Sequence, residues 1–298
     1  TEQTALVVIS VRVIVISIGT LFLSYLLSQI ALADNTQSSF VGNGACASCH
    51  KAQVQDWTNS HHDLAMQEVN EKTVLGDFDN ATFIYEGVTT TFFRKGDEYW
   101  VKTDSESGEL QDYRVAYVFG VYPLQQLLLP IQNDRLNALS IAWDARNQSK
   151  GGQRWYHIYE DQEPVTSESP LHWTSVYHNW NSRCAECHST NVVKGYDGER
   201  RQYTTTYDQI DVGCEACHGP GSRHIELAIA GKVDRSKSPA EMGLALSLAA
   251  RGQWRRAPED DIAHRVTPLT DQIQVDNCGR CHSRRATLGD YHYGQSLL

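Results

Sequence analysis

The chain has 298 residues and a formal net charge of -10, from 36 acidic and 26 basic residues. This length allows one large domain or two smaller ones. The negative balance argues against nucleic acid and against an acidic membrane surface as binding partners, and it is compatible with a basic protein partner.

An uncharged apolar run covers residues 13–33, directly after Arg12. It ends in Ala31-Leu32-Ala33, which has the small-residue pattern of a signal-peptidase site, and polar residues follow. The pattern predicts a secretory signal peptide over residues 1–33. Because the run is long for a signal peptide, an uncleaved membrane anchor is the alternative. Both interpretations predict a periplasmic or otherwise extracytoplasmic location for the rest of the chain.

Four Cys-x-x-Cys-His motifs use all eight cysteines of the chain. Random shuffling of this composition predicts about 0.01 such motifs. The motif is the attachment site of a c-type haem, because its two thiols reach the vinyl groups of the porphyrin and its histidine ligates the iron. The sequence therefore predicts four covalently bound haem c groups, called haem 1 to haem 4 in chain order. The attachment cysteines are Cys46, Cys49, Cys184, Cys187, Cys214, Cys217, Cys278 and Cys281, and the proximal iron ligands are His50, His188, His218 and His282.

Two other uses of paired cysteines are zinc sites and a disulfide framework. Neither requires a histidine directly after the second cysteine, whereas all four motifs have one. The haem interpretation is therefore favoured, and it agrees with an extracytoplasmic location, where haem is attached covalently.

The segment of haem 1 is predicted to cover residues 34–72, beginning with a polar linker. A helix is expected over residues 51–59, with Trp57 on its apolar face. His61 and His62 follow this helix, and one of them is a candidate distal ligand, on the haem face opposite a proximal histidine. A solvated polar helix end is the alternative for both.

A β-rich pattern follows in residues 73–162, which contain no cysteine. Apolar and polar residues alternate in short stretches separated by turn residues, which predicts antiparallel hairpins. The stretches are 82–85, 89–94, 98–103 and 113–119, with a further pair at 136–143 and 154–159. The fold class expected is α+β, with this β-rich module inserted among haem-packed helices and loops. We expect the module to shield the haems; a substrate-binding module is the alternative.

Residues 163–298 are predicted to form the segment of haems 2 to 4. His172 and His178 lie shortly before haem 2 and are distal candidates, of which His172 is chosen. The aromatic residues around them are expected to pack on porphyrin. These are Trp173, Tyr177 and Trp180.

The third motif is followed by a tight turn, Gly219-Pro220-Gly221, and then by His224. Glycine accepts a positive φ and proline fixes its own φ, so the chain reverses here. His224 is then too close in sequence to cap the haem of His218 easily. It is a candidate distal ligand for a neighbouring haem.

Helices are expected at residues 225–230 and 239–251, and a charged loop at 251–261. After haem 4, Arg284 and Arg285 suit paired hydrogen bonds to haem propionates, with a solvated pair as the alternative. The chain stops without a terminal signal, so we expect a fragment truncated at its C-terminus.

A conventional core is not expected for a chain of this length with this pattern. Much of the apolar surface should instead be buried against the haems. The haem-binding half should therefore be largely unfolded without its cofactors.

Several stretches together resemble the multihaem cytochromes c related to cytochrome c-554, in particular bacterial proteins with appended tetratricopeptide repeats. The resemblance covers residues from about 41 to the end. It rests on the stretches 45–50, 57–66, 73–78, 151–155, 184–191, 214–224 and 278–285. Members of this type usually continue with more haem motifs and repeats, which agrees with a truncated chain.

The resemblance also implies roles for individual residues. The family pattern Trp-x-x-Ser-x-His falls on Trp57, Ser60 and His62, which implies that His62 is a distal ligand rather than His61. The pattern His-Gly-Pro-Gly-x-x-His falls on His218 and His224.

Electron transfer between redox proteins is the leading functional hypothesis. Histidine on both faces of each iron would give low reduction potentials, since Met/His ligation raises them. Eight histidines outside the motifs are enough to close all four irons. The alternatives are a multihaem oxidoreductase with one open haem, acting on a small nitrogen or sulfur compound, and an interaction scaffold.

Overall fold

The computed structural model describes residues 38–248, 252–268, 271–283 and 292–297. The chain divides into the units Thr1–Ser38 and Ser39–Leu298, and the second is described here. The apolar run 13–33 and the pair Arg284 and Arg285 lie outside the described residues. Within the described residues, no helix combines the length and the apolar character needed to cross a membrane.

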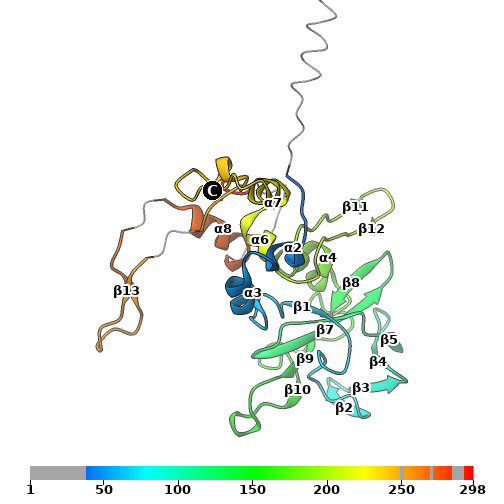
Figure 1. Cartoon of the computed structure of the whole chain (residues 1–298). Coiled ribbons are helices and arrows are strands. Elements are labelled where there is room, and N and C mark those ends of the chain that lie inside the picture. Colours follow the sequence, from blue (N-terminus) through cyan, green and yellow to red (C-terminus); the bar gives the residue numbers. More distant parts are fainter. Residues whose placement is uncertain (1–37, 249–251, 269–270, 284–291, 298) are drawn as a thin grey trace, which may run out of the picture. The chain divides into compact units, whose positions relative to one another are not determined.

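Four strands form an antiparallel sheet in chain order (Figure 1): β2 (Ala81–Tyr85), β3 (Val88–Lys95), β4 (Glu98–Asp104) and β5 (Leu110–Arg114). The turn between β2 and β3 is Glu86-Gly87, with φ of 46° and 79°. Two consecutive positive φ values are the conformation of a two-residue hairpin turn, which matches the twist of the flanking strands. The expected hairpins are present here.

A second antiparallel sheet has the order β1-β6-β7-β9-β10, and β8 also pairs with β7. Its strands are β1 (Met66–Glu68), β6 (Tyr117–Phe119), β7 (Leu124–Ile131), β8 (Arg135–Ala138), β9 (Ile141–Asp144) and β10 (Arg154–His157). The expected strand at 113–119 is split between the two sheets. The expected strand at 136–143 is broken into β8 and β9, and β9 pairs with β10 as predicted.

Strand β7 lies between two apolar clusters, and the sequence did not predict it. Leu127 and Leu129 belong to a cluster that both sheets share, whereas Leu128 belongs to a second cluster on the opposite face of β7. All three leucines are buried. A strand that is covered on both faces shows a continuous apolar run instead of alternation, so the period-two pattern is lost.

The shared cluster packs the two sheets against each other. The Trp155 ring of β10 stacks on the Phe92 ring of β3 with centroids 3.7 Å apart, and the Trp155 indole N–H donates to the Asp77 carbonyl at 3.1 Å. The expectation that the chain lacks a conventional core is therefore wrong for the β-rich part, because two clusters of buried side chains lie there.

The second cluster connects the sheet to the second Cys-x-x-Cys-His motif. It contains Met66 of β1, Phe119 of β6 and Leu128 of β7, together with Trp180 and Ala185. Trp180 opens helix α4 (Trp180–Arg183), and Ala185 opens helix α5 (Ala185–His188), which carries the second motif. The sheet therefore fixes the position of the second motif.

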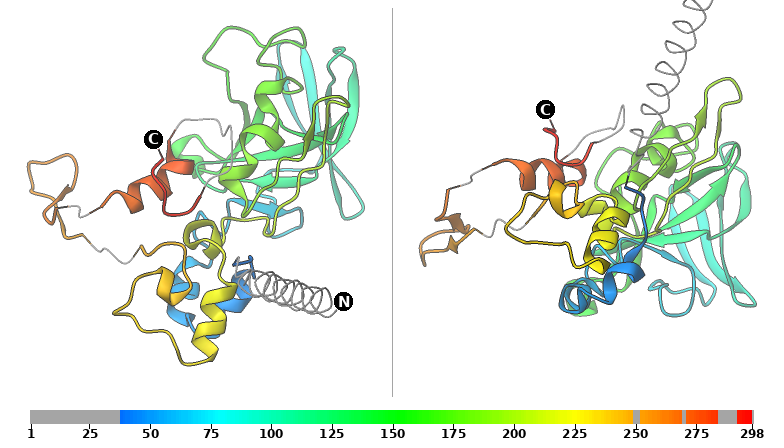
Figure 2. Two further views of the ribbon diagram at one scale, coloured as in Figure 1. Left: turned by 90° about the horizontal axis from the view of Figure 1, so that it is seen from above. Right: turned by 45° about the horizontal axis from the view of Figure 1, so that its top comes forward.

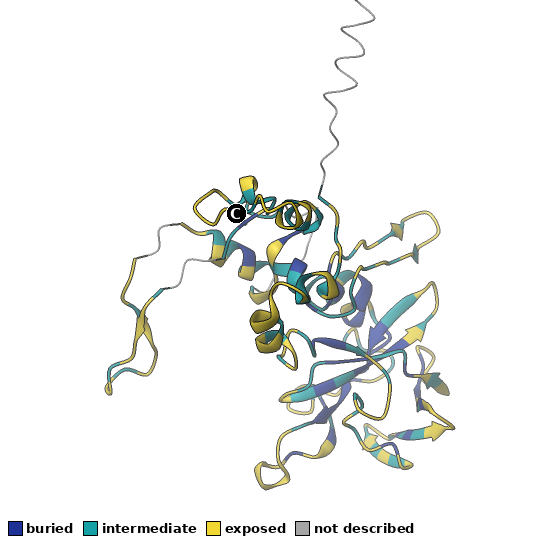
Figure 3. Cartoon of the chain, viewed as in Figure 1, coloured by how far each residue is buried: buried dark blue, intermediate teal, exposed yellow. Residues whose placement is uncertain are grey.

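The other helices are short: α2 (Asn43–Ala47), α3 (Lys51–Trp57), α6 (Cys214–His218), α7 (Ser222–Ile229) and α8 (Ile273–His282). None of α2, α3 and α7 contains a buried residue, and burial is concentrated in the sheets (Figure 3). Helices α2 and α6 lie side by side in both views of Figure 2. The α+β class is confirmed.

The structure agrees with one of three predictions for the last third of the chain and differs from the other two. The helix at 225–230 is present within α7. The helix at 239–251 is wrong in its described part, because only a 3-10 turn (Ala240–Met242) forms before Gly243 takes a φ of 73°. The charged loop at 251–261 contains strand β13 (Trp254–Arg255), which pairs with β14 (His264–Arg265).

The remaining elements are small. They are the hairpin β11 (Tyr196–Asp197) and β12 (Gln202–Tyr203), and the 3-10 turns at Gln148–Lys150 and Val176–His178.

Candidate functional site

Each Cys-x-x-Cys-His motif forms or continues a helical turn. The His50 N–H donates to the Cys46 carbonyl at 2.9 Å, and the His188 N–H donates to the Cys184 carbonyl at 3.2 Å. This places both thiols and the histidine on one side of the chain, as covalent haem attachment requires. All eight cysteines are free thiols, and among the described residues no group of three or more His, Cys, Asp or Glu side chains is arranged around a metal ion site.

The first and third motifs are in direct contact. Helix α2 packs against α6, and the Asn43 amide oxygen accepts a hydrogen bond from the Cys214 N–H at 2.8 Å. The thiols of Cys46 and Cys214 are hydrogen-bonded, and this bond lowers the pKa of Cys214 to about 7. Haems 1 and 3 would therefore be held by adjacent sulfur atoms.

The second and fourth motifs form a corresponding pair. Helix α5 packs against α8, and the Cys187 thiol hydrogen-bonds to Cys281, which lowers the pKa of Cys187. The Cys187 thiol also lies 3.9 Å from the carbonyl oxygen of Arg280.

Motifs 3 and 4 are joined by two hydrogen bonds. The Asn277 amide of α8 donates to the Cys217 carbonyl at 3.0 Å, and the Arg280 guanidinium donates to the Ala216 carbonyl at 3.1 Å. The four motifs thus contact one another in the order 1-3-4-2. Sequence reasoning missed Asn43, Asn277 and Arg280, because single polar residues beside a motif form no periodic pattern.

Two of the three proposed distal histidines face a proximal histidine. The His224 ring lies 6.2 Å from the His50 ring, centroid to centroid, and the His62 ring lies 6.1 Å from the His282 ring. Two imidazoles that bind one iron from opposite sides, each through a metal–nitrogen bond of about 2 Å, hold their centroids about 6 Å apart. The residues present therefore fit a haem iron between each pair.

The orientation of His224 is fixed by its second ring nitrogen. Its Nδ1 lies 2.8 Å from the Met242 carbonyl oxygen, to which it donates, and this leaves Nε2 free to bind metal. His62 is hydrogen-bonded to the segment just before α6: its carbonyl accepts a hydrogen bond from the Val212 N–H at 3.2 Å.

The predicted proximal histidines of the second and third motifs have lowered pKa values. Burial lowers the pKa of His188 and of His218, which favours the neutral imidazole that ligates iron. The Nδ1 of His188 lies 3.0 Å from the Ala65 carbonyl, and the Phe119 ring stands edge-on to the His188 ring at 5.3 Å. Among the described residues, no second histidine ring faces His188 or His218 in the way that the His224 ring faces His50.

His172, the third proposed distal ligand, is placed elsewhere. Its Nε2 lies 3.1 Å from an Asp104 carboxylate oxygen and its Nδ1 lies 2.8 Å from the Thr174 hydroxyl. The ring is buried in the β-rich part. With both nitrogens bonded to other side chains, His172 has no free nitrogen for an iron, and the choice of His172 is corrected on that ground.

The other residues near His172 also have structural partners. Trp173 lies in the cluster shared by the two sheets, and its indole N–H donates to the Asp104 carbonyl at 2.8 Å. The Nε2 of His178 lies 3.0 Å from the Leu171 carbonyl. Trp173 therefore packs within the protein core, contrary to the expectation that it packs on porphyrin.

Histidine burial in this region predicts acid sensitivity. Burial, together with the nearby His178, lowers the pKa of His157 from 6.5 to about 4. Below about pH 6.5 the unfolded chain therefore binds a proton that the folded chain excludes, so stability falls as the pH falls towards 4, by about 1.4 kcal/mol per pH unit. We expect His157→Gln, which keeps an acceptor for the Tyr159 N–H, to show a shallower loss of stability in urea titrations between pH 7 and pH 4.5.

The control for this prediction is His264→Gln, in the exposed hairpin β13–β14. His264 is a surface side chain, and its replacement should leave the acid dependence of the wild type unchanged. Equal slopes for His157→Gln and the wild type would contradict the assignment of acid sensitivity to His157.

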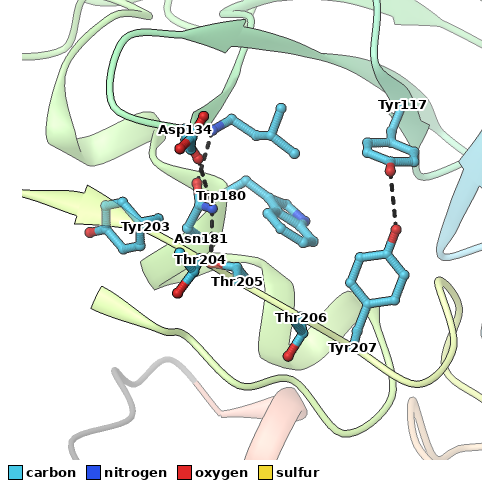
Figure 4. Close-up of a pocket in the computed structure, with 10 residues that line it drawn as sticks. Tyr117, Asp134, Trp180, Asn181, Tyr203, Thr204, Thr205, Thr206 and Tyr207 are labelled. Carbon is cyan, nitrogen blue, oxygen red and sulfur yellow. Dashed lines mark hydrogen bonds between the residues drawn. The ribbon is translucent and has the colours of Figure 1, made fainter. Parts of the chain in front are cut away.

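An open pocket of about 500 Å³ lies beside helix α4 (Figure 4). The hydroxyl groups of Tyr117 and Tyr207 are 3.1 Å apart at one side of it, and the Asn181 amide donates to the Thr205 hydroxyl at 2.9 Å at the other. None of the motif histidines lines this pocket.

Comparison with known proteins gives a consistent result. Residues 45–81 and 142–219 match the family described as cytochrome c554 and c-prime, and the matched residues include the first three motifs. No curated protein matches the chain.

Two solved structures are similar to the chain. The outer cell wall cytochrome OcwA is 22% identical with a TM-score of 0.40, over 68% of this chain and 36% of that protein. The undecahaem cytochrome from the S-layer of Carboxydothermus ferrireducens is 18% identical with a TM-score of 0.38, over 68% of this chain and 25% of that protein. The chain therefore spans roughly a third or less of the length of these two proteins.

Cytochromes of this kind carry covalently bound haem c and transfer electrons. The family match covers three Cys-x-x-Cys-His motifs, and the fourth contacts the second and the third in the folded chain. Over residues 45–81 and 142–219 the chain therefore resembles the multihaem cytochromes c of this family.

Proposed function

We propose that this chain binds four haem c groups and carries electrons between redox proteins outside the cytoplasm. The observation that carries the proposal is the pairing of His50 with His224 and of His62 with His282, each at the span of two imidazoles on one iron. Haem iron supplies the one-electron exchange between Fe(III) and Fe(II). The protein supplies the attachment points, the axial ligands and the order of the sites.

The contacts between motifs support a continuous path with the order 1-3-4-2. Adjacent thiols join motifs 1 and 3 and motifs 2 and 4, and the side chains of Asn277 and Arg280 join motifs 3 and 4. In this proposal, each attached porphyrin lies next to another one. Electrons can then enter at either end of the series.

Histidine ligation on both faces of an iron gives a low reduction potential. Met66 is the methionine to consider as an alternative ligand. Met66 is fully buried in the cluster around Leu128, and its sulfur accepts a hydrogen bond from the Ser189 hydroxyl at 3.6 Å. It therefore does not serve as the axial ligand that would raise a haem potential.

The segments predicted from the sequence are retained in this proposal. Residues 34–72 carry haem 1 and residues 163–298 carry haems 2 to 4, while residues 73–162 supply most of both sheets. The role proposed for these sheets is to support the second motif and to limit the access of water to it, since their second cluster packs on α4 and α5.

A haem count and a ligation test address the proposal together. We expect four covalently bound haems per chain by pyridine haemochrome and by mass, and low-spin spectra for at least the two histidine-paired haems. Fewer than four haems would contradict the count. A haem that binds carbon monoxide in the wild type would favour the oxidoreductase alternative, because an open iron is what that chemistry requires.

A further inference from the structure

Glu215 is a buried carboxylate inside the third motif. It is the residue between Cys214 and Ala216 of α6, and only 2% of its surface is exposed. Glutamate is rarely buried to this extent, because removing its charge from water is costly unless hydrogen-bond donors replace the water. The third motif itself does not require a glutamate at this position, since its attachment chemistry uses only the cysteines and the histidine.

Three backbone N–H groups bind this carboxylate. Val41 donates to both oxygens at 3.0 and 2.9 Å, Gly42 donates at 2.7 Å and Gly221 donates at 2.8 Å. All these partners are donors, as an ionised carboxylate requires. Hydrogen bonds from N–H groups to a charged acceptor are shorter and stronger than neutral ones.

The donors belong to two other parts of the haem 1 site. Val41 and Gly42 directly precede α2, the helix that leads to the proximal His50. Gly221 directly precedes α7, the helix that carries His224. One side chain thus connects the third motif with the segments that hold both axial histidines of haem 1.

The charge of Glu215 also reaches two attachment points. Its electrostatic interaction extends to the thiol of Cys46 and to the thiol of Cys214, which hold haem 1 and haem 3. A fixed negative charge near a haem favours Fe(III) over Fe(II), and it does so more strongly when water is excluded.

We propose that Glu215 is a positioning residue that aligns His50 with His224, and that its buried charge holds the potentials of haems 1 and 3 low. This inference rests on the proposed attachment of haem at the first and third motifs. It deepens that function, because it assigns control of two specific haems to a residue that is neither an attachment point nor an axial ligand.

The test compares Glu215→Gln and Glu215→Asp in the full holoprotein by spectroelectrochemical titration and by electron paramagnetic resonance. Glu215→Gln removes the charge and places an amide N–H against backbone donors. We expect the potentials of two of the four haems to rise and the low-spin signal of one haem to change. Glu215→Asp keeps the charge but is one methylene shorter, so we expect potentials close to the wild type and a similar change in the low-spin signal.

Glu186→Gln is the matched control. Glu186 occupies the second x position of the second motif, carries the same charge and is partly exposed. We expect it to leave the ligation of haem 1 unchanged. A shift of the same two haems in Glu186→Gln would overturn the assignment to Glu215.

The remaining outcomes are also decisive. Wild-type potentials and signals in Glu215→Gln would overturn the inference while leaving the haem count intact. If Glu215→Gln gives no holoprotein, an unaltered low-spin signal in Glu215→Asp overturns the positioning role. A wild-type protein without haem at motifs 1 and 3 would instead remove the proposed function itself, and mass analysis of the wild type reveals that case separately.

Discussion

Replacing His224 by alanine should make one of the four haems reactive to carbon monoxide, while the other three keep their wild-type spectra. The His224 ring faces His50 at 6.2 Å, and its Nδ1 is bound to the Met242 carbonyl, so its Nε2 is the group available to the iron of haem 1. Without this ring, the iron keeps only its proximal ligand and takes up an external one. The optical change on adding carbon monoxide should correspond to about a quarter of the total haem absorbance.

Two further measurements make this expectation specific. Added imidazole should restore the low-spin spectrum of His224→Ala, because it replaces the missing ring. His264→Ala, which removes an exposed histidine from strand β14, should behave as the wild type. If His224→Ala shows no new reactivity towards carbon monoxide, His224 is not the ligand that closes haem 1.

Trp155→Ala should have the largest effect on the stability of the sheets, about 3–5 kcal/mol of unfolding free energy. The Trp155 ring stacks on Phe92 and stands edge-on to Phe78 and Trp143, with centroids 5.7 and 5.2 Å away. Its removal leaves a large cavity between the two sheets and an unpaired Asp77 carbonyl. Urea unfolding followed by far-ultraviolet circular dichroism measures the loss.

Trp254→Ala is the matched control for that experiment. Trp254 lies in the hairpin β13–β14 and is 62% exposed, so its removal should change the stability by less than about 0.5 kcal/mol. Equal losses for the two variants would show that the stacking between the sheets contributes little.

The four haem-attachment motifs could be predicted from the sequence, whereas the pairing of histidines from distant segments could not. The four motifs and their proximal histidines follow from five-residue patterns, because covalent attachment and proximal ligation need only neighbouring residues. The partner of His62 is His282, from the other end of the chain. Such a pair depends on how the sheets and the short helices pack, and no local pattern contains it.

The errors have a similar origin. His172 looked like a ligand because it precedes a haem motif, but Asp104 of β4 and Thr174 bind its two nitrogens. A neighbour from a distant strand decided its role. Strand β7 was not recognised because its leucines face two cores, which removes the alternation by which strands are identified.

The two histidine pairs have a consequence for the whole chain once iron is bound. Each iron becomes a cross-link between distant segments, from residue 50 to residue 224 and from residue 62 to residue 282. The two closed loops overlap, so residues 62–224 lie within both of them. In the chain-entropy account of disulfides, closing a loop of more than a hundred residues contributes about 5 kcal/mol by restricting the unfolded chain. The axial ligands would then stabilise the fold as disulfide bonds do in small secreted proteins. They would do so in a part of the molecule whose helices α2, α3 and α7 bury no residue.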